Sequence, residues 1–240
     1  MREHKVKYLF LTILVTVLTL HSSACLSIEK NMSQESLQTI SASLTDAGYT
    51  GLFLSGDRSL SDSIWQNGEN RTSLEQIVKS SEYPDLARIL ASEVLYEKVP
   101  DYPLEEWNST LAYLYSQALA LTGVETGGMQ ITGNQWGYMY HSDEAGVQDY
   151  GALGLHLVET GTTAIPYLTT LLDNTDTIFY EGSREATLGN SLRYRVKDAA
   201  AYFIGKIAGI PVQFYDQPAD RDAEIERLKQ ALNNTNNLGE

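Results

Sequence analysis

A cluster of histidines and carboxylates lies in one glycine-rich stretch in the middle of the chain. His141, Asp143, Glu144, Asp149 and His156 fall within 16 positions, and the cluster holds two of the four histidines of the sequence. Imidazole and carboxylate groups are ligands for zinc and other divalent cations, so His141, Asp143 and His156 form a candidate metal site. Their spacing matches none of the compact zinc motifs. The alternative is that His156 lies on a helix flank and that the acids belong to an ordinary loop.

Aromatic residues alternate just before this cluster. They follow Gly133 and Asn134 at every second position, a pattern typical of a hairpin or of an irregular aromatic loop. Such rings could stack on a sugar or a peptide while an amide side chain supplies hydrogen bonds. The candidate ligand-binding residues are Asn134, Trp136, Tyr138 and Tyr140. The alternative is that the aromatic rings pack the loop against neighbouring helices, and Trp136 is the ring for which this alternative is favoured.

Other kinds of reaction chemistry have little support in the sequence. No Gly-x-Ser-x-Gly motif of a hydrolase nucleophile is present. The acidic pairs Glu105–Glu106 and Asp220/Asp222 lie at predicted helix starts, where the helix dipole favours negative charge. We therefore predict no catalytic residues, and no cofactor other than the divalent cation considered above.

The start of the chain has the three parts of a bacterial export signal. Arg2, Lys5 and Lys7 give a basic head, residues 8–20 form an apolar run, and small residues precede Cys25. The apolar run is shorter than the roughly 20 residues that a helix needs to span a bilayer. We therefore predict a cleavable signal peptide over residues 1–24 and not a membrane-spanning anchor.

The residues Ser22, Ser23, Ala24 and Cys25 resemble a bacterial lipobox. In that family the cysteine thiol is lipidated, and the cysteine becomes the first residue after cleavage. Ser22 departs from the leucine that the family prefers, and the alternative is an ordinary signal peptide cut near Ala24. Leu26 stands where an inner-membrane retention signal would have aspartate. The resemblance implies that Cys25 carries lipid, palmitate included, and that the protein is held at the outer membrane, facing the periplasm or the exterior.

The charge of the chain excludes one large class of partners. The sequence has 17 Lys and Arg against 31 Asp and Glu, and without residues 1–24 these counts become 14 and 30, a net charge of −16. Such a charge repels nucleic acid and anionic lipid head groups, so no nucleic-acid partner is expected. Cys25 is the one cysteine, and its lipidation would leave no thiol for catalysis, metal binding or disulfides.

Apolar residues at helical spacing dominate the remainder of the chain. The clearest stripe consists of Leu104, Trp107, Leu111, Leu114, Ala118 and Leu121, and it ends before Gly123. Further helices are expected over residues 33–47, from about 72, and over 84–98, 152–159, 164–172, 195–208 and 220–232. A short strand is expected at residues 52–54.

Two of these helices resemble a HEAT repeat, a pair of antiparallel helices that stacks into a solenoid. Residues 164–168 (Ala-Ile-Pro-Tyr-Leu) and 171–173 match its first helix, and residues 195–201 (Arg-Val-Lys-Asp-Ala-Ala-Ala) with 204–207 match its second. Residues 174–194 stand where the family has a short turn, and no other clean repeat of fixed period is present. The resemblance implies a surface for a protein partner and no reaction.

These patterns together predict a mainly α-helical fold, with an irregular helical domain over residues 33–232. The HEAT-like antiparallel pair would span about 161–209, and a Gly- and aromatic-rich loop or small hairpin would lie in the middle. Residues 25–32 would form a lipidated linker, and residues 233–240 a flexible tail.

The function that these features favour is a non-enzymatic binding or scaffolding module of the cell envelope. The membrane would be contacted through the N-terminal lipid, and the partner would be an envelope protein or a glycan. The alternative is a metal-dependent hydrolase acting on an envelope polymer or peptide, with its metal at His141, Asp143 and His156.

Overall fold

The computed structural model describes most of the chain after its start. The described residues are 34, 36–103, 105–127, 132–138, 150–182 and 184–237. Cys25, Tyr140, His141 and Asp143 lie outside them, as does the predicted signal peptide. Within the described residues, no helix combines the length and the apolar character that crossing a membrane requires.

The described residues form helices and their connections, which confirms the predicted mainly α-helical fold. A first helix covers residues 36–49. The elements that follow are η1 (Thr50–Leu54), α2 (Ser59–Trp65), η2 (Gln66–Gly68), α3 (Arg71–Lys79), α4 (Asp85–Lys98), η3 (Glu105–Trp107), α5 (Asn108–Leu121), α6 (Val124–Gly127), α7 (Ala152–Glu159), η4 (Gly161–Ala164), α8 (Ile165–Thr169), α9 (Arg184–Leu192), α10 (Val196–Ala208) and α11 (Pro218–Asn237). β-Structure in this part of the chain is limited to two isolated bridges, one between Gly123 and Ile178 and one between Thr177 and Arg195.

The segment after the first helix corrects one expectation, because residues 50–54 form the π-helical turn η1 and not a strand. Gly48, next to the last residue of the first helix, has a φ angle of 61°, a left-handed conformation that glycine adopts readily. Beyond it the chain keeps a helical path, since Tyr49 and Leu52, three residues apart, are both buried in the core.

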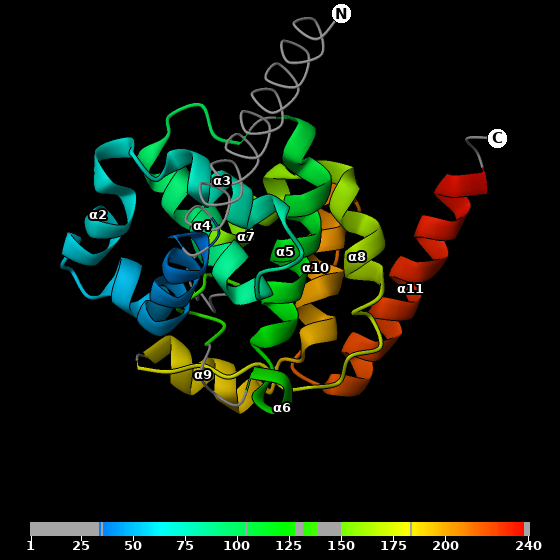
Figure 1. The fold of residues 1–240 in the computed structure, drawn as a ribbon. Helices are drawn as coiled ribbons and strands as arrows, with labels where there is room; N and C mark the ends of the chain where they lie inside the picture. Colours follow the sequence, from blue (N-terminus) through cyan, green and yellow to red (C-terminus); the bar gives the residue numbers. More distant parts are fainter. Residues whose placement is uncertain are drawn as a thin grey trace, which may run out of the picture.

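Helix α4 is enclosed on all sides, and both candidate sites described below are built around it. The nine consecutive residues 87–95 are buried, whereas a surface helix would expose one face. Helices α3 and α5 pack against it, and Figure 1 shows it in the interior of the helical assembly. Arg88, Ser92 and Glu93 are buried with the apolar residues. Buried polar groups need hydrogen-bond partners, so these three residues fix the position of neighbouring helices.

Helix α10 forms the second buried axis, and small residues allow its neighbours to approach closely. Ala199, Ala200 and Ala201 are buried, and α7, α8 and α11 pack on this helix. A Cβ atom at Gly205 would lie 2.6 Å from the carbonyl oxygen of Ile210. The segment after α10 can therefore pass this close to the helix only because residue 205 is glycine. Figure 1 shows α11 along one edge of the molecule, on the side opposite α2.

An extended strap, residues 176–181, joins the two halves of the chain. Its backbone pairs with Gly123 on one side and with Arg195 on the other. Two asparagine side chains extend this pairing: Asn134 exchanges two hydrogen bonds with the backbone of Glu181. Asn190 does the same with the backbone of Tyr180. The side-chain amide of asparagine presents a donor and an acceptor like a peptide group, so each residue serves as a short strand partner.

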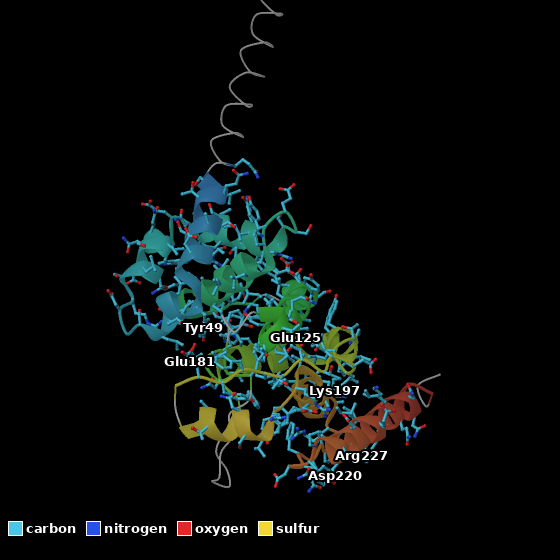
Figure 2. The ribbon with its side chains drawn as sticks, turned by 90° about the horizontal axis from the view of Figure 1, so that it is seen from below. Tyr49, Glu125, Glu181, Lys197, Asp220 and Arg227 are labelled. Carbon is cyan, nitrogen blue, oxygen red and sulfur yellow. The ribbon has the colours of Figure 1, made fainter. Side chains whose placement is uncertain are left out.

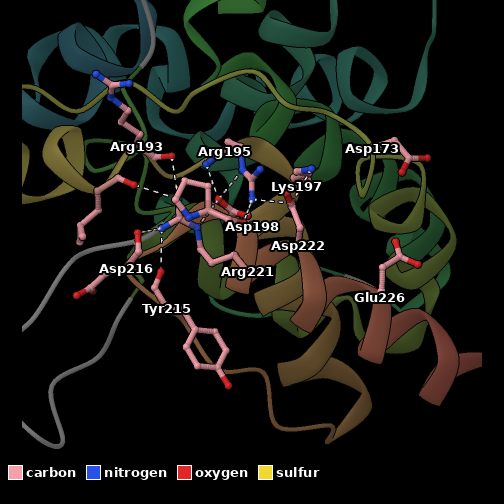
Figure 3. A network of polar contacts seen from close by, with 12 residues as sticks. Asp173, Arg193, Arg195, Lys197, Asp198, Tyr215, Asp216, Arg221, Asp222 and Glu226 are labelled. Atoms are coloured by element: carbon pink, nitrogen blue, oxygen red, sulfur yellow. Dashed lines mark hydrogen bonds and ion pairs between the residues drawn. The ribbon is translucent and has the colours of Figure 1, made fainter.

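A buried arginine fixes the start of α11 against α10. Arg221 is 2% exposed, and its Nε lies 3.1 Å from Oδ2 of the buried Asp198. Its two terminal nitrogens donate to four backbone carbonyls, those of Leu192, Arg193, Tyr215 and Asp216. Figure 3 shows the guanidinium at the centre of these contacts. In Figure 2, α11 with its residues Asp220 and Arg227 extends away from the first helix and Tyr49, so this arginine anchors a peripheral element.

Candidate functional site

The buried carboxylate of Glu93 on α4 is the centre of a polar network between three helices. Its Oε1 accepts a hydrogen bond of 2.6 Å from the hydroxyl of Tyr115 on α5. The same oxygen lies 2.7 Å from Nδ1 of His156 on α7. The side chains of Glu93 and His156 are 4% and 14% exposed. One carboxylate therefore connects α4, α5 and α7.

A chain of hydroxyl groups leads to this carboxylate. Ser92 Oγ lies 2.9 Å from the hydroxyl of Tyr102 and 2.9 Å from that of Tyr115. The Tyr115 hydroxyl uses its hydrogen in the bond to Glu93, so it accepts a hydrogen bond from Ser92. The Ser92 hydroxyl in turn accepts a hydrogen bond from Tyr102. Charge-assisted hydrogen bonds of this kind stabilise a buried anion.

Burial keeps these phenols protonated. It raises the pKa of Tyr102 and Tyr115 above the ordinary value of 10.0, and that of Tyr138, whose hydroxyl donates to the Tyr115 carbonyl, rises for the same reason. Phenolate in a dry interior would lack the solvation that it has in water. The tyrosines consequently act as fixed donors and not as acids.

His156 is the member of this network whose side chain is suited to acid–base or metal chemistry as well as to packing. Its ring stacks on Tyr96, with centroids 3.5 Å apart and an angle of 5° between the planes. When His156 is neutral, the bond to Glu93 holds the proton on Nδ1 and leaves Nε2 as an acceptor. A histidine oriented in this way by a carboxylate is found both in general bases and in metal ligands.

The predicted metal site is brought together only in part. His156 is paired with Glu93, which lies 63 residues away in sequence, and the other two predicted ligands, His141 and Asp143, lie outside the described residues. Within the described part of the chain, no three His, Cys, Asp or Glu side chains are arranged to hold a metal ion. The metal site stays a prediction.

The described members of the predicted ligand site are buried. Asn134, Trp136 and Tyr138 are 8%, 3% and 0% exposed. Asn134 binds the strap, the Trp136 ring contacts that of Tyr49, and the Tyr138 hydroxyl binds the α5 backbone. These three side chains hold their segment against the core, while Tyr140 lies outside the described residues. A ligand role for this stretch also stays a prediction.

A groove at the start of α4 was not predicted from the sequence. It has a volume of about 560 Å³ and opens to solvent between α4, α5 and α8. Its lining residues are Ser81, Tyr83, Asp85, Arg88, Ser109, Thr110, Tyr113 and Tyr167. Volumes of this size are typical of small-ligand sites.

Arg88 forms the floor of this groove and is 6% exposed. Its Nε donates to the Val78 carbonyl at 3.1 Å, and Nη1 donates to Oδ1 of Asp85 at 2.8 Å. The other oxygen of Asp85 accepts a bond of 2.9 Å from the Tyr113 hydroxyl, and this bond raises the pKa of Tyr113. Three side chains of the groove are thus fixed by one another before any ligand arrives.

One sequence signal could have indicated this groove. Asp85 and Arg88 interrupt the apolar pattern of the predicted helix over residues 84–98, three positions apart on one face. An arginine flanked by core residues of a helix needs a partner or a ligand. The groove's other walls come from α5 and α8, which local patterns cannot bring together with α4.

Comparison with known proteins yields no relative from which a role could be transferred. No family model, no curated protein and no solved structure matches this chain.

Proposed function

We propose that this protein is a lipid-anchored binding module of the cell envelope, without enzymatic activity, and that the groove between α4, α5 and α8 is its ligand site. The groove is the observation that supports this proposal. It combines half-buried aromatic rings with polar groups that the fold already orients, namely Arg88, Asp85 and Tyr113. Preorganised polar groups beside apolar surface give affinity and orientation at little entropic cost.

The groove's own chemistry favours binding over reaction. The residues that line it are serine, threonine, tyrosine, aspartate and arginine, with no histidine, lysine or cysteine among them. The two oxygens of Asp85 are held by Arg88 and Tyr113 and not by a serine or threonine of the lining. A nucleophile next to a general base, the usual requirement for covalent catalysis, is missing from this set.

A metal-dependent hydrolase is the second candidate, and one observation favours it. The Nδ1 atom of His156 is bonded to Glu93, as in histidine ligands whose second nitrogen binds a metal. His141 and Asp143 would have to supply the remaining ligands. A stoichiometric divalent metal in the purified protein that is lost in His156→Ala would support this candidate over the binding module.

We expect Cys25 to carry the membrane anchor. Mass spectrometry of the mature protein should show Cys25 as the first residue with added lipid, and Cys25→Ser should release the protein from membranes. A Cys25→Ser protein that stays in the membrane fraction, or a mature wild type with a free thiol, would contradict the anchor and leave the groove unaffected.

We expect the groove to bind a fragment of the envelope. Residues 25–240, labelled for NMR, would be titrated with a neutral disaccharide, a uronic acid and a short peptide. Binding at the groove should shift signals of Tyr83, Tyr113 and Tyr167 in saturable fashion, and Tyr167→Ala should weaken it about tenfold or more, since aromatic contacts carry much of the affinity at such sites. Tyr215→Ala, which removes a half-buried ring at another place, is the matched control. The proposed function would be overturned if none of the three ligands shifted the NMR signals of the groove residues.

A further inference from the structure

The charges in the groove balance, and this limits the ligand. Arg88 and Asp85 form an ion pair of 2.8 Å, and the other lining residues are uncharged serine, threonine and tyrosine. An anionic ligand would gain from Arg88 but meet Asp85, in a chain whose formal net charge is −14. A cationic ligand would meet Arg88 at the floor. The groove therefore favours a ligand without net charge.

The groove also presents hydrogen-bond donors and acceptors side by side. Nε and Nη1 of Arg88 are used internally. Among the described residues, no hydrogen bond of Nη2 accompanies these two, and Arg88 lines the groove. Both oxygens of Asp85 accept one bond each and keep free lone pairs. The hydroxyls of Ser81, Ser109 and Thr110 can serve in either role.

Tyrosine rings supply the apolar part of the walls. Tyr113 and Tyr167 meet edge to face, with centroids 5.8 Å apart and planes at 73°. The Tyr167 hydroxyl lies 3.4 Å from Ser109 Oγ, which links α8 to α5 across the groove. Tyrosine gives a rigid apolar face with a polar edge.

We infer that the groove binds a neutral saccharide, such as a pyranose unit of an envelope glycan. Sugar hydroxyls donate and accept hydrogen bonds at once, so they match Arg88, Asp85 and the wall hydroxyls, while the C–H face of the ring packs on tyrosine. A peptide that binds as an added strand needs a sheet edge, and the described residues form no sheet. This inference rests on the proposed function and names its ligand class.

The same titration distinguishes the ligand classes. N,N′-diacetylchitobiose or cellobiose should bind saturably at the groove, and glucuronate should bind at least about tenfold more weakly than the neutral sugar. Tyr113→Phe, which keeps the ring but removes the hydroxyl that fixes Asp85, should weaken sugar binding, and so should Ser109→Ala. Both variants leave the core intact, and circular dichroism would verify their folding.

Three outcomes would overturn the inference. If glucuronate or the peptide shifts the groove signals and neither neutral sugar does, the ligand class is wrong and the binding module stands. If no ligand shifts them, the inference and the proposed function fail together. If Tyr215→Ala weakens sugar binding as much as Tyr167→Ala, the sugar binds elsewhere.

Discussion

Replacing Arg221 by methionine is expected to lower the free energy of unfolding by about 3–5 kcal/mol, the range found when one partner of a buried ion pair is removed. The substitution would take one of two guanidinium partners from the Asp198 carboxylate, whose side chain is 0% exposed, and leave Arg195 as the other. It would also remove the donors of four backbone carbonyls that hold the segments on either side of α10. Urea denaturation followed by circular dichroism would measure the change.

Lys229→Met on the same helix is the matched control for Arg221→Met. Lys229 pairs with Asp173 and Glu226, whose side chains are 89% and 64% exposed. Exposed pairs contribute about 0–1 kcal/mol, so this variant should unfold close to the wild type. Arg221→Lys keeps the charge but lacks the planar fork that reaches several carbonyls, and it should remain destabilised. Equal stability of Arg221→Met and Lys229→Met would show that the arginine does not anchor α11.

Alkaline pH is expected to unfold the protein steeply, because its buried tyrosines cannot lose their protons in place. Burial raises the pKa of Tyr115, Tyr138 and Tyr180 above 10.0. The unfolded chain releases these protons near pH 10, whereas the folded state keeps them, so above that pH the folded state binds more protons. Their contribution to stability is complete below about pH 10 and is lost as the pH rises further.

The size of this effect follows from the number of tyrosines. Each one lowers stability by about 1.4 kcal/mol per pH unit above pH 10, so the three together remove about 4 kcal/mol per unit. Domains are commonly stable by about 5–15 kcal/mol, and unfolding should therefore be well advanced by about pH 12–13. During one pH titration, the absorbance of tyrosinate at about 295 nm would follow tyrosine ionisation, and far-UV circular dichroism would follow the loss of helix. Because proton release is linked to unfolding, the two signals should change together.

Tyr138→Phe tests whether the ionisation of buried tyrosines causes the alkaline unfolding. It removes one titrating phenol and the bond of its hydroxyl to the Tyr115 carbonyl. The variant should lose some stability at neutral pH, yet its stability should fall less steeply above pH 10. Complete tyrosine ionisation with full helicity retained would contradict the prediction.

The helices that carry the core were predictable because each displays its own periodicity. The pattern over residues 152–159 has the same bounds as α7, and the one over residues 84–98 differs from α4 by one residue at the start. Helix α9 was missed, since it lies in the insertion over residues 174–194, where turn-like and polar residues mask its few apolar ones. Such a helix is stabilised by its tertiary setting: a Cβ atom at Gly189 would lie 2.8 Å from the Tyr180 ring.

The polar sites could not be predicted from local patterns. His156 was selected for its closeness in sequence to His141, whereas the structure pairs it with Glu93 on another helix. The groove likewise joins Arg88 of α4 with Tyr113 of α5 and Tyr167 of α8. Charged residues within apolar helices, Arg88 and Glu93 among them, were the available signal that partners exist, but their identity depends on how the helices pack.

The strap places a constraint on the order in which this chain can fold. The carbonyl of Thr122, at the end of α5, accepts the N–H of Phe179, and the carbonyl of Thr177 accepts the N–H of Val124. During synthesis from the N-terminus, α5 is complete more than 50 residues before these partners emerge. Its end must then wait, with apolar surface exposed, for a long-range closure that is intrinsically slow. The first half of the protein therefore completes its packing only when residues 176–181 are available to pair with the end of α5.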